Sequence, residues 1–316
     1  METRNPGGRR SGTAASVRLS VLTALAATAA AFGAGVQAQT DAAPVRDGES
    51  RVVLVTGSTD GLGREVALRV AATGAHVIVH GRNRERGEAV VAQIERAGKG
   101  SARFYAADLA SLAEVRRFAE SVLRDYDRLD VLVNNAGIAQ LGDAATRRES
   151  ADGHELAFAV NYLSHFLLTR MLLPRITASA PARIINVSSI GQSPIDFDDV
   201  NLERGWSGGR AYGQSKLAQI MFTFDLAAEL QGRNVTVNAL HPATYMATNM
   251  VTSAGIEPRS TVEQGAEAVM HLVTDPSAGT GQFFNGTRPA RANAQAYDPA
   301  VRAQLRELSR RLTGTD

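Results

Sequence analysis

From residue 51 onward, short runs of mostly apolar residues alternate with longer stretches in which apolar residues recur at helical spacing. The short runs are rich in β-branched residues and have little polar alternation, which is typical of parallel strands covered on both faces. We expect strands over residues 51–56, 76–80, 102–106, 129–134, 183–187 and 235–240, and a short last strand over 281–285. We expect helices over residues 63–72, 85–97, 112–125, 153–176 and 211–230, and a polar helix over 299–312.

This alternation predicts the fold class. Strands that take turns with helices form a doubly wound α/β structure, in which right-handed crossovers build a parallel sheet of the Rossmann type. The pattern continues without a linker or an internal repeat. A single domain over residues 51–316 is therefore expected.

The first 50 residues have a different composition. Arginines precede an apolar, alanine-rich run over residues 19–35, and Val36 and Ala38 then occupy the −3 and −1 positions of a signal-peptidase site. This pattern predicts a secretory signal peptide over 1–38 and a linker over 39–50. The run is short for a membrane span, so a cleaved signal and an exported, periplasmic protein are favoured over a membrane anchor. The alternative is a mis-set start codon and a cytoplasmic protein that begins near Val45.

Composition excludes several kinds of site. The formal net charge is +2 and no dense Lys/Arg patch is present, which argues against a nucleic-acid partner. The chain has no cysteine, so a disulfide, a thiol nucleophile and a thiolate metal site are all excluded. His154 and His165 lie eleven positions apart, with no carboxylate at a recognised ligand spacing. No metal site is expected.

A glycine-rich turn follows the first expected strand. Glycine permits a tight turn and a close backbone approach to a pyrophosphate, and the N-terminus of the next helix attracts the anion. The strand–turn–helix context predicts a dinucleotide site. The turn reads Thr56-Gly57-Ser58-Thr59-Asp60-Gly61-Leu62-Gly63.

The end of the second strand indicates which dinucleotide binds. NAD sites place an acidic residue there to bind the ribose hydroxyls. Gly81 occupies this place and Arg82 follows it. Since a guanidinium suits a 2′-phosphate, NADP is favoured over NAD.

Tyr212 and Lys216 lie four positions apart in the last long helix, and therefore on one helix face. A neighbouring ammonium stabilises a phenolate and lowers its pKa. A tyrosine tuned in this way can act as an acid or base near neutral pH.

Two further motifs complete a family pattern. Asn134-Asn135-Ala136-Gly137 closes the fourth strand and Ser188-Ser189 follows the fifth. With these motifs, the glycine turn and the Tyr–Lys pair, the chain resembles the short-chain dehydrogenase/reductase family. The resemblance implies the catalytic residues Asn161, Ser189, Tyr212 and Lys216. It also implies a cofactor site made by Thr56, Gly57, Ser58, Asp60, Gly61, Leu62, Gly63, Arg82, Asp108, Leu109, Asn135, Ala136, Gly137, Tyr212, Lys216 and Pro242.

The resemblance also implies the role of each catalytic residue. Tyr212 exchanges the hydroxyl proton, and Lys216 lowers the pKa of that phenol and holds the nicotinamide ribose. Ser189 orients the substrate oxygen. Asn161 holds a water that relays protons from solvent.

Ser189 and Tyr212 are 23 positions apart, more than in many family members. The extra segment resembles the insert of the retinol dehydrogenase and WW-domain oxidoreductase branch, which implies NADP and lipophilic alcohols or carbonyls. Two roles remain open for its Phe197 and Trp206, because they either line a pocket wall or pin the insert to the sheet.

The segment after the sixth expected strand departs from the family pattern. Ala243 follows Pro242 where the family usually has glycine. Either Thr244 or Thr248 is expected to contact the amide of the cofactor. Tyr245 and Met246 are expected to face the substrate.

The sequence therefore predicts an NADP-dependent oxidoreductase that interconverts a lipophilic alcohol and its aldehyde or ketone. The alternatives are an NADP-binding sensor or scaffold without chemistry, and a C=C reductase of the same fold. Since the long helices of this family often pair between subunits, a homo-oligomer is also implied.

Overall fold

The computed structural model describes residues 50–140 and 145–315, which form a single α/β domain. The predicted signal peptide over 1–38 lies outside the described residues, as does all of the predicted linker except Ser50. The doubly wound architecture predicted from the alternation of strands and helices is confirmed.

The strands of this domain form one sheet of eight strands among the described residues, in the order β3-β2-β1-β4-β5-β6-β7-β8. The pairs are parallel as far as β7, and β8 pairs with β7 in the antiparallel sense. β8 was not expected from the sequence, because its three residues include a proline and no apolar run. The strands are β1 Val52–Val55, β2 His76–Gly81, β3 Ser101–Ala106, β4 Val131–Asn134, β5 Ala182–Val187, β6 Val235–His241, β7 Gln282–Asn285 and β8 Arg288–Ala290.

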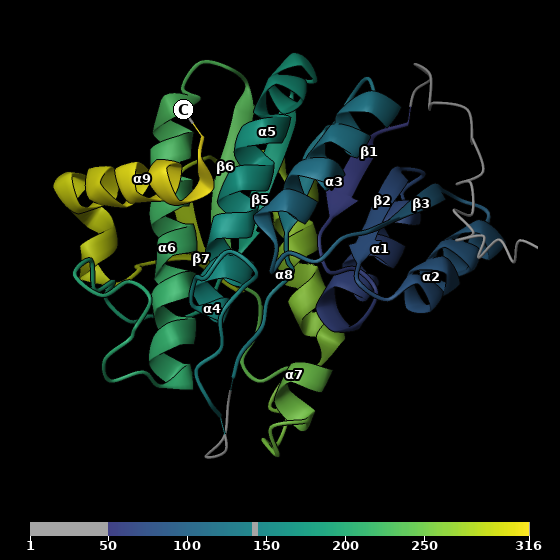
Figure 1. The fold of residues 1–316 in the computed structure, drawn as a ribbon. Helices are drawn as coiled ribbons and strands as arrows, with labels where there is room; N and C mark the ends of the chain where they lie inside the picture. The colour runs from purple at the N-terminus through teal and green to yellow at the C-terminus, as the bar shows by residue number, and fades with distance from the viewer. Residues whose placement is uncertain (1–49, 141–144, 316) are drawn as a thin grey trace, which may run out of the picture. The chain divides into compact units, whose positions relative to one another are not determined.

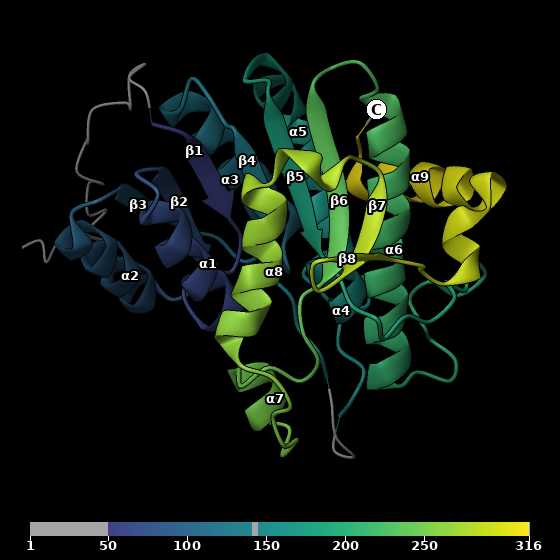
Figure 2. The same cartoon turned by 180° about the vertical axis from the view of Figure 1, so that it is seen from behind.

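Helices cover both faces of the sheet. Helices α3, α5 and α6 lie on the face seen in Figure 1, and α1, α2 and α8 lie on the face seen in Figure 2. The short helices α4 and α7 lie at the edge of the sheet where the strands end. The helices are α1 Gly61–Ala71, α2 Arg84–Ala97, α3 Leu112–Asp125, α4 Leu156–Phe158, α5 Ser164–Ala178, α6 Gly208–Glu229, α7 Asn249–Thr252, α8 Val262–Thr274 and α9 Pro299–Thr313.

Local sequence signals fix where these helices begin. The Asn83 side chain accepts a hydrogen bond from the Arg86 amide at the start of α2, and Gly98 ends that helix with a φ of 66°. Helix α8 begins with a capping box, in which Thr261 and Gln264 each bond the backbone of the other. This box was the signal by which α8 could have been predicted.

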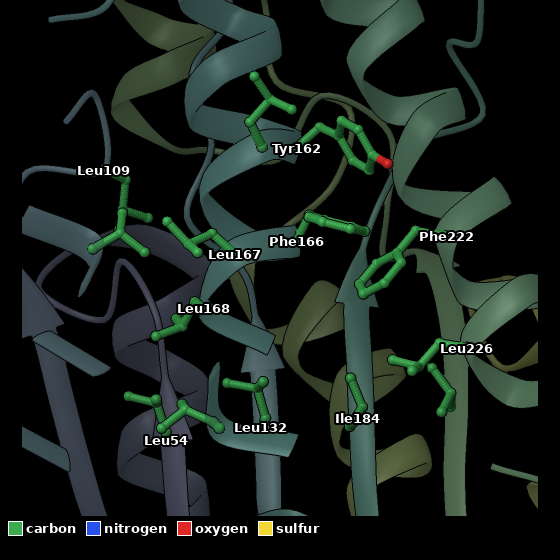
Figure 3. Packing of buried hydrophobic residues seen from close by; sticks show 14 of the residues in the cluster. Leu54, Leu109, Leu132, Tyr162, Phe166, Leu167, Leu168, Ile184, Phe222 and Leu226 are labelled. Carbon is green, nitrogen blue, oxygen red and sulfur yellow. The ribbon is translucent and has the colours of Figure 1, made fainter. Parts of the chain in front are cut away.

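The core is built by apolar side chains from the sheet and from both helix layers. Figure 3 shows Leu54, Leu132 and Ile184 of the strands directed toward Phe166 and Leu167 of α5. Leu167 is fully buried. Its truncation to alanine is expected to cost about 2–5 kcal/mol.

The helix predicted over residues 153–176 is confirmed over most of its length, but its start and its internal geometry differ from the prediction. It begins at Leu156 and contains a π-helical segment, Ala159–Leu163, before α5. A π turn carries an extra residue that periodicity does not reveal, and such turns are frequent at functional sites. Leu156–Ala178 is long and apolar enough to cross a membrane, but 78% of its apolar window is buried within the domain.

Helix α9 crosses α6 on the outside of the domain (Figure 1). The sequence predicts a polar helix here, and its bounds are nearly those expected. Leu305 and Leu308 are buried against the domain, and the Tyr162 and Ser309 hydroxyls lie 2.6 Å apart. Arg302 adds an ion pair with Asp225 of α6.

Candidate active site

The carboxyl ends of β1 and β4 meet where the strand order reverses, and the glycine turn lies at this point. Gly57 has a φ of 63°, and a Cβ on it would lie 2.8 Å from the Ala136 Cα. A Cβ on Gly63 would collide with the Gly57 carbonyl oxygen. Both glycines are therefore required by close backbone approach.

Residues at the end of β4 hold the turn in place. The Thr56 hydroxyl oxygen accepts hydrogen bonds from the Asn135 amide at 2.9 Å and the Ala136 amide at 3.0 Å. The Asn135 side-chain amide donates back to the Thr56 and Gly57 carbonyl oxygens. Ser58 is buried and ties the turn to β2, because its hydroxyl accepts from the His80 amide. Several predicted cofactor residues thus shape the turn.

Two buried histidines brace the same turn, and sequence reasoning assigned them no role. His80 Nδ1 accepts from the Gly57 amide at 3.1 Å. His165 Nε2 lies 3.0 Å from the Thr56 hydroxyl, and its Nδ1 lies 3.0 Å from the Asn161 carbonyl oxygen. Since that carbonyl can only accept, His165 carries its proton on Nδ1, and its Nε2 accepts a hydrogen bond from the Thr56 hydroxyl. His165 therefore connects the turn to Asn161.

Burial keeps both histidines neutral. It lowers the pKa of His80 to about 4 and that of His165 to about 3. His165 follows Asn161 by four positions in an otherwise apolar helix, and this spacing was the available sequence signal.

The first turn of α1 can receive an anion. Asp60 caps the helix by accepting from the Gly61 amide at 2.7 Å. The Leu62 and Gly63 amides have no acceptor within the part of the chain that the structure describes. Free amides at a helix N-terminus are suited to a phosphate. The turn therefore fits the pyrophosphate of a dinucleotide.

Charged side chains line the neighbouring ends of β2 and β3. Arg82 is exposed over 70% of its side chain, and its guanidinium lies 3.7 Å from the Asp108 carboxylate. Arg86 approaches Asp60 at 3.4 Å, beside an open cleft of about 290 Å³. Leu109 is buried in the core, so its side chain anchors this loop.

Tyr212 and Lys216 lie on α6, which Ser207 caps. The Lys216 Nζ lies 5.7 Å from the centroid of the Tyr212 ring. It donates to the Val187 carbonyl oxygen at 2.8 Å and to the Gln219 Oε1 at 2.9 Å. Gln219 is buried. Its Oε1 accepts the hydrogen bond from Lys216, whereas its Nε2 has no hydrogen-bond partner among the described residues.

The pKa of Tyr212 shifts in the direction opposite to the one predicted. Burial raises the pKa of the phenol above its ordinary value of 10, and the hydrogen bond with Ser189 offsets part of this rise. Burial also lowers the pKa of Lys216 to about 7, so the ammonium is a weaker local cation than the sequence argument assumed. The spacing of the two residues along the chain does not show how deeply they are buried, so this desolvation could not be predicted from it.

Ser189 and Asn161 complete the predicted group. The Ser189 hydroxyl oxygen accepts from the Gly191 amide at 3.0 Å. The Asn161 Oδ1 accepts from the Ile138 amide, and its Nδ2 donates to the Ile138 carbonyl and the Ser215 hydroxyl. Both N–H groups of this amide are thus used within the protein.

Gly137 lies between two of these side chains. A Cβ on it would be 3.3 Å from the Asn161 Oδ1 and 3.4 Å from the Lys216 Nζ. The structure therefore brings Asn161, Lys216 and the β4 motif together, as the sequence predicts.

The insert between Ser189 and Tyr212 packs onto the domain. Trp206 packs beside Leu202, and its Nε1 donates to the buried Glu155 at 3.3 Å. Phe197 packs against the core cluster. Of the two roles left open for these aromatic residues, the contacts favour pinning the insert.

The segment after β6 folds over the glycine turn. The Thr244 hydroxyl pairs with His241, whereas a Cβ on Gly61 would lie 3.1 Å from Thr248. Asn249 of α7 donates a hydrogen bond to the Asp60 carboxylate. Helix α7 therefore lies against the turn.

The two residues of this segment that are expected to face the substrate differ in environment. Tyr245 is 42% exposed and lies under the Arg259 guanidinium, which is 5.5 Å from the ring centroid. Met246 is partly buried and packs against the core close to Gly265, and its contact with substrate stays a prediction.

Comparisons with known proteins agree with this geometry. Residues 51–258 match the family model described as short chain dehydrogenase. Retinol dehydrogenase 14 of Homo sapiens is 36% identical over 294 residues, which cover 84% of this chain and 86% of that protein. A short chain dehydrogenase structure from Shigella flexneri complexed with NADP is 28% identical, with a TM-score of 0.60, and covers 75% of this chain and 97% of that one. One from Escherichia coli complexed with NADPH is 29% identical, with a TM-score of 0.61, and covers 75% and 96%.

Proposed function

Because this chain belongs to the short-chain dehydrogenase family and is related to retinol dehydrogenases, we propose that it is an NADP-dependent oxidoreductase that interconverts a lipophilic alcohol and its aldehyde or ketone. The observation that carries the proposal is the proximity of the Ser189 and Tyr212 side chains beside Lys216. A Cβ on Gly191 would lie 3.5 Å from the Ser189 Oγ and 4.0 Å from the Tyr212 ring, and the Lys216 Nζ lies 5.7 Å from the centroid of that ring. These groups lie at the edge of the sheet that holds the glycine turn.

The bound nicotinamide would supply or accept the hydride. Leu62 and Gly63 would hold the pyrophosphate through their amides, and Arg82 would hold the 2′-phosphate. The residues of the chain then have to bind the substrate oxygen, orient it and move one proton.

Tyr212 is suited to give that proton. Its raised pKa keeps the phenol protonated at neutral pH, which is the state that a general acid needs. The Ser189 hydroxyl would hold the substrate oxygen beside the phenol. Lys216 is anchored to the Val187 carbonyl on one side, which keeps its ammonium near the Tyr212 ring. Asn161 supports the arrangement, because Ser215 links its amide to the Tyr212 carbonyl.

A preference for NADP is supported by residues at the end of β2. Gly81 presents no acid to a ribose hydroxyl, and the Arg82 side chain is largely exposed beside it. Fluorescence titration of the wild-type protein with NADPH and NADH tests this preference. Equal affinities would refute the cofactor assignment.

A lipophilic substrate is supported by the apolar side chain next to Ser189. Ile190 is 50% exposed, although burial is the usual state of isoleucine. A panel of aldehydes and ketones of increasing apolar length, followed by NADPH oxidation, tests this part. Preference for short hydrophilic carbonyls would contradict it. Reduction of activated C=C bonds in the same panel would favour the C=C reductase alternative.

Replacement of Tyr212 by phenylalanine tests the chemistry. The ring packing stays and the proton is lost, so we expect turnover to fall at least ~100-fold, with NADPH affinity unchanged. Tyr297→Phe, at an exposed tyrosine on another part of the domain, is the matched control. Retained turnover in Tyr212→Phe would refute the mechanism. If the wild-type protein binds NADPH but does not oxidise it when any carbonyl of the panel is added, a sensor or scaffold is favoured.

We also propose that the chain is exported after cleavage behind Ala38. N-terminal sequencing of the protein purified from its native source is expected to begin at Gln39. A sequence that begins at or near Val45 would support the cytoplasmic alternative.

A further inference from the structure

Thr59 of the glycine turn lies against Gly81 at the end of β2. A Cβ built on Gly81 would be 2.5 Å from the Thr59 Cγ2, 2.9 Å from its Oγ1 and 3.3 Å from its Cβ. Gly81 does not have a positive φ. Lack of space, rather than backbone conformation, therefore requires glycine at this position.

Thr59 cannot make room by rotation. Its Cβ carries two heavy atoms and one hydrogen, distributed over three staggered positions. Both positions near Gly81 are filled by heavy atoms, so the hydrogen points away. Any rotation about χ1 brings the hydrogen into one near position and leaves a heavy atom in the other. Every rotamer of Thr59 thus collides with a side chain at position 81.

The blocked position is the one where an NAD site presents its acid to the ribose hydroxyls. The next residue, Arg82, bears the exposed guanidinium that suits a 2′-phosphate, and its ion pair with Asp108 is long at 3.7 Å. Thr59 itself lines the open cleft that also contains Arg64 and Arg86.

We propose that Thr59 is a specificity-determining residue, which enforces NADP by barring any acidic side chain from position 81. This inference rests on the NADP preference proposed above. It goes further in assigning the choice of cofactor to a contact between two elements, so that the choice cannot be reversed at position 81 alone.

Four variants test the steric part of the proposal by thermal melting without any cofactor. Gly81→Ala is expected to lower the melting temperature by several degrees, because even a methyl group collides with Thr59. Thr59→Gly/Gly81→Ala is expected to melt close to Thr59→Gly, so the penalty disappears when the threonine is removed. Gly209→Ala is the matched control, since a Cβ there meets no atom within 4 Å. A full penalty for Gly81→Ala in the Thr59→Gly background would overturn the proposal, as would no penalty in either background.

Fluorescence titration with NADPH and NADH tests the cofactor part. Gly81→Asp alone is expected to lower the affinity for both NADPH and NADH at least ~10-fold, because the glycine turn must move to make room for the new side chain. Thr59→Gly/Gly81→Asp is expected to shift the NADH-to-NADPH affinity ratio at least ~100-fold toward NADH, as the carboxylate gains the ribose hydroxyls and repels the 2′-phosphate. An equal shift in Gly81→Asp alone would overturn the role of Thr59.

The two levels of proposal fail in different ways. If the wild-type protein shows no preference between NADPH and NADH, the proposed cofactor is wrong whatever the variants do. If the wild-type protein prefers NADPH but the double variant does not shift the ratio, the cofactor assignment stands and the inference about Thr59 fails.

Discussion

Acidification from pH 7.5 to pH 5.5 is expected to remove about 5 kcal/mol from the free energy of unfolding, through histidines that the fold keeps neutral. Burial lowers the pKa of His76, His80 and His241 to about 4, and that of His165 to about 3. All of these imidazoles are at most 6% exposed. Their ordinary pKa of 6.5 returns when the chain unfolds.

The sign follows from proton linkage. Each folded pKa is depressed, so the unfolded chain binds more protons at any pH between the two values. The stabilisation is fully present above pH 6.5 and is lost as pH falls toward about 4. At pH 5.5 an unfolded histidine is about 90% protonated while the folded one is nearly neutral, which costs about 1.3 kcal/mol for each side chain. The loss over the four residues is a large part of the ~5–15 kcal/mol that stabilises a typical domain.

Urea unfolding at both pH values measures this loss, with circular dichroism as the signal and the single Trp206 as a second probe. His76→Gln removes one titrating group far from the active site, and the pH-dependent loss is expected to shrink by about 1.3 kcal/mol. His154→Gln, at a partly exposed position, is the matched control. Equal stability at pH 7.5 and 5.5, or an unchanged pH dependence in His76→Gln, would refute the reasoning.

Two further predictions concern the support of the catalytic helix. In Gly213→Ala the new Cβ would lie 2.8 Å from the Ser193 backbone nitrogen. The insert must then shift beside Ser189, so kcat/KM is expected to fall at least ~10-fold. Gly209→Ala is the control, and wild-type kinetics in Gly213→Ala would contradict the packing. In Gln219→Leu, Lys216 loses one of its two acceptors, its pKa falls further below about 7, and the limb of the pH–rate profile that it governs is expected to move to lower pH. An unmoved profile in Gln219→Leu, with Gln231→Leu at an exposed position as control, would show that Gln219 only fills space.

The strands and most helices could be predicted because each repeats a local pattern. The run Val52–Val55 is apolar at every position, and Ser111 stands one residue before the helix that it caps. The glycine turn was also predictable, since a strand, a glycine string and a helix follow one another along the chain. These features depend on neighbours in sequence.

The rest depends on contacts between distant segments. The π turn at Asn161 is accompanied by bonds to Ile138 and Ser215, which no period in the sequence reveals. The raised pKa of Tyr212 comes from desolvation by the whole site, so the cation four residues away was a poor guide to its direction. The bracing by His80 and His165 likewise needs the sheet, which places β2 and α5 on the same turn.

The contact of α7 with the glycine turn has a kinetic consequence. Asn249 donates a hydrogen bond to Asp60, and Thr248 lies beside Gly61. We expect a dinucleotide to enter or leave this turn when that hydrogen bond breaks and α7 moves away. We therefore expect the residence time of a bound dinucleotide to depend on this exposed polar contact. A substitution at Asn249 is therefore expected to change turnover through the rates of cofactor binding and release, because it leaves the predicted catalytic residues unchanged.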